Sequence, residues 1–140
     1  MKTLKSVLTG IALLFICVAA NATVNPIADK PTKTDVINTY IDAITHGKTN
    51  NIEGILDNSM EYDIQRGENV NTLTKDDLLA AIKNAGIDAN VTATTTIMAD
   101  DDDASTVKVD FKYGDYVRTD VVTLSKTTGW VITKVVTSYK

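Results

Sequence analysis

The chain has 140 residues, of which 14 are Lys or Arg and 18 are Asp or Glu, so its formal net charge is −4. An acidic surface repels phosphate backbones and anionic lipid headgroups, which argues against a nucleic-acid or membrane-surface partner. The length suits one domain with a single core, and no internal repeat indicates a second domain.

The N-terminus has the pattern of a secretory signal peptide over residues 1–22. Lys2 and Lys5 precede an almost unbroken apolar run over residues 7–20. This run is shorter than the roughly 20 residues that a transmembrane helix needs. Ala20-Asn21-Ala22 then forms an A-x-A cleavage signal. We therefore expect an exported protein, periplasmic or extracellular, that has no membrane contact after cleavage.

The single cysteine, Cys17, lies inside that apolar run. A lipid-anchored exported protein carries its cysteine at the cleavage site, directly after a small residue, but Ile16 stands there, so we favour a plain signal peptide over a lipoprotein. Cleavage after Ala22 leaves no cysteine, which excludes a disulfide or a thiol nucleophile. Residues 23–31 are expected to form a flexible leader before a single domain at 32–140.

Two threonine–aspartate pairs predict where helices begin. Thr32 with Asp35, and Thr74 with Asp77, have the spacing of a capping box. Glycines end both helices, at Gly47 after His46 and at Gly86. Each helix has an apolar stripe at helical spacing, made of Val36, Ile37, Tyr40, Ile41 and Ile44 in the first and Leu78, Leu79, Ile82 and Ala85 in the second.

The segments around these helices complete an α+β pattern. A short further helix is expected around Ile52, Ile55 and Leu56. Alternating residues predict strands at 60–65 and 70–73, a threonine-rich strand at 87–98, and an antiparallel meander over 105–113, 116–125 and 130–139. The order is therefore α-α-β-β-α followed by four antiparallel strands, with one face of the sheet covered by helices.

Two stretches resemble the nuclear transport factor 2-like superfamily: VINTYIDAITHG at 36–47 and TDVVTLSKTTGWVITKV at 119–135. The chain is most similar to its small exported bacterial branch, described as Putative lumazine-binding or polyketide cyclase-like, over about residues 32–139. The resemblance implies a cystatin-like cone, in which a curved antiparallel sheet packs on three helices around a pocket. It also implies a homodimer formed through the outer sheet face.

One enzyme of this superfamily, ketosteroid isomerase, uses an aspartate base with an oxyanion hole made of a tyrosine and a protonated aspartic acid. The resemblance puts Tyr40 at the tyrosine position and Asp120 near the protonated acid. The position of the base falls on Ile64, and the neighbouring Asp63 has the opposite strand parity. Isomerase chemistry is therefore not expected.

Asp120 is the most informative residue, because it shares strand parity with the apolar Val122 and Leu124, where an unpaired carboxylate is costly. Two interpretations stay open. Asp120 and Tyr40 could anchor a polar group of a ligand, or Arg118, which has the same parity, could pair with Asp120 in a structural ion pair while Tyr40 is a core residue.

Aromatic residues on the inner face suit either a pocket wall or a plain core. The candidate pocket comprises Tyr40, Tyr62, Ile64, Phe111, Arg118, Asp120 and Trp130. His46, the only histidine, suits a helix end better than a general base. The four aspartates at 100–103 suit a solvated hairpin tip better than a calcium loop. We expect no catalytic residue, no metal site and no cofactor.

These observations predict an exported, non-catalytic cone-fold protein that binds a small, partly apolar molecule or serves as a dimeric scaffold. One alternative is a pocket enzyme (an isomerase, cyclase or dehydratase) that uses Tyr40 and Asp120. Another is a protein–protein interaction module that uses the outer sheet face, on which Thr119, Val121 and Thr123 lie.

Overall fold

The computed structural model describes residues 15–16, 30–88 and 90–140. The predicted signal peptide with Cys17 and the predicted leader therefore lie outside the described residues, apart from residues 15–16 and 30–31. The two-residue strand β1 (Phe15–Ile16) pairs with β4 at Thr94 and Thr95. No helix within the described ranges is long and apolar enough to cross a membrane.

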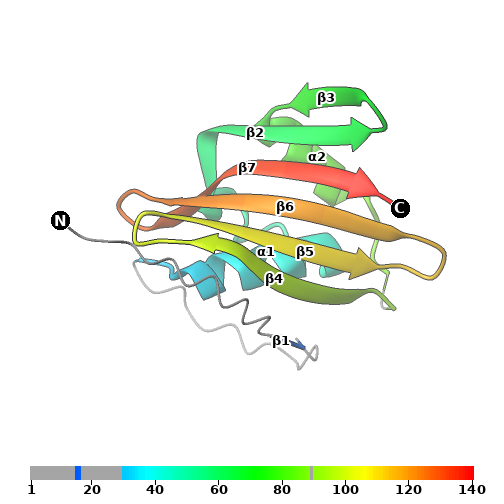
Figure 1. The fold of residues 1–140 in the computed structure, drawn as a ribbon. Helices are drawn as coiled ribbons and strands as arrows, with labels where there is room; N and C mark the ends of the chain where they lie inside the picture. Colours follow the sequence, from blue (N-terminus) through cyan, green and yellow to red (C-terminus); the bar gives the residue numbers. More distant parts are fainter. Residues whose placement is uncertain (1–14, 17–29, 89) are drawn as a thin grey trace.

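The fold consists of two α-helices on one face of a curved sheet, which confirms the α+β prediction (Figure 1). The sheet order is β1-β4-β5-β6-β7-β2-β3. After β1 the elements are α1 (Lys33–His46), the 3-10 turn η1 (Glu53–Ile55), β2 (Leu56–Arg66), β3 (Asn69–Leu73), α2 (Lys75–Asn84), β4 (Thr92–Asp100), β5 (Ala104–Lys112), β6 (Val117–Lys126) and β7 (Trp130–Tyr139).

Capping boxes begin both helices, as predicted. In α1 the Thr32 hydroxyl accepts from the Asp35 backbone N–H, and the Asp35 carboxylate accepts from the Thr32 N–H, at 3.2 and 2.8 Å. Thr74 and Asp77 form the same pair at the start of α2. Gly47, with φ of +62°, is the left-handed cap of α1. These caps fix where each helix begins relative to the sheet.

The second helical segment is shorter than predicted. Only Glu53–Ile55 forms a 3-10 turn, and Leu56 already begins β2, where it lies opposite Ile132 of β7. The strand before the acidic tip also begins later than predicted, at Thr92. In both places apolar residues occur without a clear period, and tertiary pairing decides the conformation.

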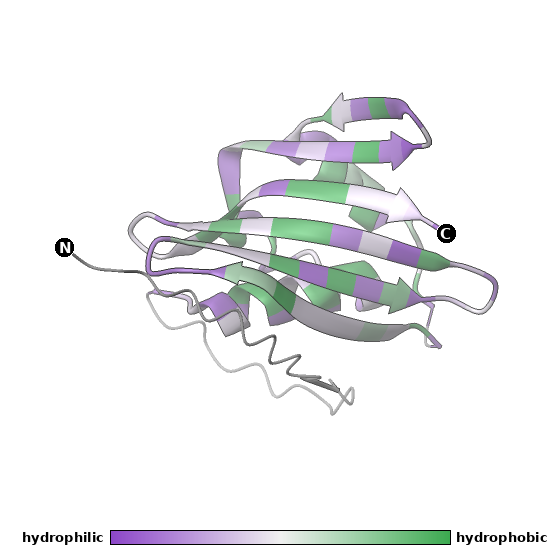
Figure 2. Ribbon diagram, viewed as in Figure 1, coloured by the Kyte–Doolittle hydropathy of each residue, from purple (hydrophilic) through white to green (hydrophobic). Residues whose placement is uncertain are grey.

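Strands β4 to β7 form the predicted antiparallel meander. Figure 2 shows hydrophobic and hydrophilic residues alternating along these strands. The sequence did not indicate that β2 pairs with β7 in parallel. This pairing brings β2 and β3 to the far side of the meander and places α2 against β2. The inner sheet face and the two helices enclose a core centred on Tyr40, Phe111, Val122, Leu124 and Val135.

Candidate functional site

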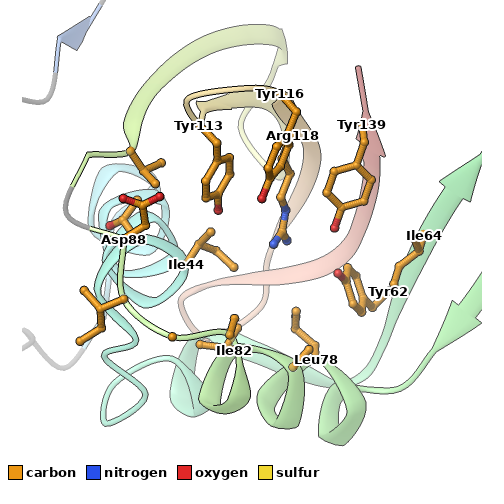
Figure 3. Close-up of a pocket in the computed structure, with 16 residues that line it drawn as sticks. Ile44, Tyr62, Ile64, Leu78, Ile82, Asp88, Tyr113, Tyr116, Arg118 and Tyr139 are labelled. Atoms are coloured by element: carbon orange, nitrogen blue, oxygen red, sulfur yellow. The ribbon is translucent and has the colours of Figure 1, made fainter.

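A cavity of about 500 Å³ lies between α2 and the end of the sheet where β6 begins and β7 ends. Its size is typical of small-molecule sites. Its lining comes from the end of α1, from β2, α2 and the segment after α2, from the β5–β6 hairpin and from the end of β7 (Figure 3).

One side of the cavity is apolar. Leu78 and Ile82 come from the buried stripe of α2, and Ile44 from the last turn of α1. Ile87 and Val91 extend this surface along the segment that joins α2 to β4. The same helical spacing that buries these side chains therefore also provides a surface on which an apolar molecule can lie.

The opposite side is aromatic and carries hydroxyl groups. Tyr62, Tyr113, Tyr116 and Tyr139 line the cavity, and Figure 3 shows their hydroxyl ends directed towards its interior. The rings of Tyr113 and Tyr116 are stacked, with centroids 4.6 Å apart and planes 10° from parallel. Tyr139 is tilted against Tyr116 at 6.1 Å. Such a wall offers flat surfaces together with hydrogen-bonding groups.

Arg118 is the only cation among the described lining residues. Its Nε donates to Asp120 Oδ1 and its Nη2 donates to Asp120 Oδ2, both at 2.9 Å. Asp120 also accepts from the hydroxyls of Tyr40, at 2.6 Å, and Thr137, at 2.7 Å. The strand register explains this cluster, because Asp120 lies directly opposite Thr137 and Arg118 lies two residues before it on the same face.

Burial and neighbouring charges shift the pKa values of Tyr40 and Arg118 in this cluster. Burial raises the pKa of Tyr40 well above its usual value, and the negative charge of Asp120 raises it further, so the tyrosine keeps its proton. Burial is the largest single influence on Arg118 and would lower its pKa, but the charge and hydrogen bonds of Asp120, together with Tyr40 and Tyr62, outweigh burial and hold that pKa well above its usual value. Burial also raises the pKa of Tyr62 and Tyr113 at the cavity wall.

The structure divides the seven predicted pocket residues into two groups. Tyr62, Ile64 and Arg118 line the cavity. Four others are buried in the core and are not among its lining residues: Tyr40, Phe111, Asp120 and Trp130. Of these, Trp130 lies at the opposite end of β7 from the cavity, with Lys33 over its ring. The Arg118–Asp120 ion pair that one interpretation anticipated is present. Tyr40 bonds to Asp120, where that interpretation expected an ordinary core tyrosine. Ligand contact by any of the seven stays a prediction.

Sequence reasoning missed Tyr113, Tyr116 and Tyr139 as lining residues. A signal for them exists. Tyr113 follows Phe111 at a spacing of two, Tyr116 precedes Arg118 at the same spacing, and Tyr139 lies opposite Arg118 in the sheet. Parity alone would extend the pocket face to these strand ends. Helix α2 packs at this end of the sheet and closes one side of the cavity. Strand parity does not predict where a helix packs.

The remaining candidates are not among the residues that line the cavity. His46 Nδ1 is 3.4 Å from the Asp42 carboxylate at the end of α1. The Asp101 carboxylate accepts from the backbone N–H groups of Asp103 and Ala104, and Lys33 pairs with Asp100. These hydrogen bonds are those of an ordered hairpin tip. Within the described part of the chain, no three His, Cys, Asp or Glu residues gather as a metal site would require.

The fold is shared with proteins of known structure. Over 76% of its length the chain matches a nuclear transport factor 2-like protein of unknown function from Silicibacter pomeroyi, with 21% identity, a TM-score of 0.61 and 90% of that chain covered. A similar protein of unknown function from Shewanella baltica matches over 76% of this chain, with 13% identity, a TM-score of 0.65 and 90% of that chain covered. A third such protein, from Methylobacillus flagellatus, matches at 19% identity and a TM-score of 0.61, over 76% of this chain and 88% of that one. Among curated proteins no significant match was found.

Residues 28–138 match the sequence family described as Putative lumazine-binding. The match covers both helices and strands β2 to β7 except the last residue of β7, Tyr139, and it includes every other described residue that lines the cavity. The chain therefore belongs to the Putative lumazine-binding family and has the nuclear transport factor 2-like fold.

Proposed function

We propose that the protein binds a small, planar and partly apolar molecule in the cavity between α2 and the sheet, and that it performs no catalysis of its own. The observation that carries the proposal is the composition of the cavity lining. Leu78 and Ile82 face tyrosines across a space of about 500 Å³. A flat ring system could bury its faces there while its edge reaches the hydroxyl groups.

The family name supports this proposal and suggests one molecule to test, because lumazine is a planar heteroaromatic compound with carbonyl oxygens. Because the name describes the family and not this chain, the ligands to be tested are a wider panel of flat metabolites that includes lumazine.

The non-catalytic role is supported by the state of Tyr40 and Asp120. Both side chains are fully buried, and each is engaged in the cluster with Arg118 and Thr137. A general acid or base must come within hydrogen-bonding distance of the reacting group. At the base position that ketosteroid isomerase would use, Ile64 lines the cavity and offers no proton acceptor.

Export and dimerisation belong to the same proposal. We propose that residues 1–22 direct the protein to the periplasm or the exterior, and that two copies pair through the outer sheet face. Thr119, Val121 and Thr123 lie on this face and are partly exposed. A shallow hollow there is bordered by Lys108, Asp110, Lys112 and Lys140, so the face carries both signs of charge. Opposite charges would help two such faces align.

A thermal-shift screen with matched variants of α2 tests the binding proposal. A ligand that binds only the folded state raises the unfolding midpoint. Ala81 lines the cavity, whereas its neighbour Ala80 does not. We expect panel members, lumazine included, to stabilise the wild type and Ala80→Trp but not Ala81→Trp, whose indole narrows the cavity. Equal stabilisation of both variants would place the binding elsewhere, and no stabilisation by any panel member would contradict the proposal.

A further inference from the structure

Arg118 has hydrogen-bond donors that the protein itself does not use. A guanidinium carries five N–H groups. The Nε and Nη2 groups donate to Asp120, and Nη2 also lies 3.5 Å from Thr137 Oγ1. Nη1 makes no hydrogen bond to any residue that the structure describes. No buried side-chain nitrogen or oxygen in the described residues lacks a partner, so Nη1 must be accessible. Figure 3 shows the guanidinium directed into the cavity.

The surroundings of Arg118 hold these free donors in one orientation. The two carboxylate oxygens of Asp120 accept hydrogen bonds from Nε and Nη2 of Arg118. The hydroxyls of Tyr40 and Thr137 donate to the same carboxylate and hold it in place. On the other side the guanidinium carbon lies 5.8 Å from the centre of the Phe111 ring. The Arg118 side chain is 13% exposed. A donor that is already oriented loses little conformational entropy when a ligand binds.

The charges around the cavity favour an uncharged acceptor over an anion. Asp120 lies directly behind Arg118 and neutralises it. Asp88 is the only carboxylic acid among the described lining residues, and no second Lys or Arg is among them. A carboxylate or phosphate entering this space would lose its hydration without gaining an uncompensated positive charge. A carbonyl oxygen has a much smaller desolvation cost and can still accept from Nη1.

We infer that Arg118 Nη1 recognises a carbonyl oxygen on an uncharged, planar aromatic ligand, whose ring lies against the tyrosine wall. Asp120 is a positioning residue in this account, because it orients the guanidinium and cancels its charge. The inference rests on the proposed function, and it specifies the ligand class as neutral carbonyl-bearing ring systems. It predicts that planar carboxylates and planar hydrocarbons of the same size bind with lower affinity than these carbonyl compounds.

Three probes of similar size separate these classes: quinolin-2-one with a carbonyl, 2-naphthoate with a carboxylate, and naphthalene with no oxygen. Their affinities can be measured by NMR titration of the full domain while the Arg118 side-chain N–H signals are followed. We expect quinolin-2-one to bind most tightly and to shift the Nη1 signals.

Arg118→Lys keeps a positive charge beside Asp120 but loses the planar donor edge. It should weaken quinolin-2-one about tenfold, roughly the value of one charge-assisted hydrogen bond, and leave naphthalene unchanged.

The matched control is Arg66→Lys, an exposed arginine at the β2–β3 turn, which should change no affinity. Should Arg118→Lys fail to fold, Asp120→Asn provides a second readout. It removes the neutralising charge, so the preference should shift towards 2-naphthoate.

The inference would be overturned if 2-naphthoate bound the wild type more tightly than quinolin-2-one, or if Arg118→Lys weakened naphthalene and quinolin-2-one alike. Failure of quinolin-2-one to bind would also overturn it. In that case the wider panel and the Ala81→Trp variant still decide the proposed function independently.

Discussion

At the scale of single residues, the buried carboxylate of Asp120 determines how much its hydrogen-bonding neighbours contribute to the stability of the fold. It has no solvent exposure and accepts hydrogen bonds from Tyr40, Arg118 and Thr137. A buried ion pair adds little net stability when it is complete, but removing one partner leaves an uncompensated charge. The cluster is therefore a place where single substitutions have large effects.

Arg118→Met is expected to lower the free energy of unfolding by about 3–5 kcal/mol, because it leaves Asp120 charged and unpaired. Urea denaturation measures this loss. Arg66→Met at the exposed turn should stay within about 0.5 kcal/mol of the wild type. The double variant Arg118→Met/Asp120→Asn should recover part of the stability, since no charge remains buried. Equal, small effects of Arg118→Met and Arg66→Met would contradict this account of the ion pair.

Tyr40→Phe removes one hydrogen bond to a charged acceptor and is expected to cost about 1.5–3 kcal/mol of unfolding free energy. Tyr116→Phe is the control, because Tyr116 is 43% exposed. Denaturation curves of the two variants measure the difference. Were the two losses the same, the Tyr40–Asp120 bond would have no special energetic role.

The pH dependence of the same variant tests the protonation of Tyr40. The pKa of Tyr40 is raised in the folded state, chiefly by burial, above its unfolded value of about 10. Its contribution to stability is therefore complete below the unfolded pKa and is lost as the pH rises towards the folded pKa. Above about pH 10 the wild type should lose stability more steeply with rising pH than Tyr40→Phe does. Parallel stability curves over that range would contradict the assignment.

At the scale of elements, local chemistry in the sequence predicted how segments begin and end. Thr32 with Asp35, and Thr74 with Asp77, mark both helix starts because the capping box involves neighbouring residues only. The parallel pairing of β2 with β7 was not predicted, since alternation shows which face of a strand is buried but not which strand lies beside it.

In the candidate site too, strand parity predicted some features and not others. Parity correctly put Arg118 on the same face as Asp120, and their ion pair follows from it. Parity does not show how far the helices cover that face. Phe111 is therefore covered by the core, while Tyr113 and Tyr139, at the strand ends, line the cavity.

Helix α2 provides the apolar side of the cavity, so its cap should affect stability and binding together. Thr74→Ala removes the capping hydroxyl and should lower the unfolding free energy by about 1 kcal/mol. Thr128→Ala, in the exposed β6–β7 turn, is the control and should have little effect. Thermal denaturation in the presence and absence of a panel ligand measures both quantities. An unchanged midpoint for Thr74→Ala would mean that the cap does not stabilise α2.

At the scale of the whole molecule, the proposed dimer can be separated from the fold. Val121→Asp places a carboxylate opposite Lys108 on the outer sheet face, a favourable pair within one subunit. The same charge would be buried at a subunit interface. Sedimentation velocity should show a dimer for the wild type, a folded monomer for Val121→Asp and a dimer for Val70→Asp on the exposed strand β3. A monomeric wild type would contradict the dimer proposal.

The central claim is that the cavity beside Arg118 holds a small molecule, and native mass spectrometry of protein purified from its own host tests it most directly. The account predicts a subunit that carries a non-covalent adduct of small mass. The adduct should persist in Ala80→Trp and disappear in Ala81→Trp, because only Ala81 lines the cavity. Bare polypeptide mass in the wild type, or an adduct that survives in Ala81→Trp, would contradict the claim.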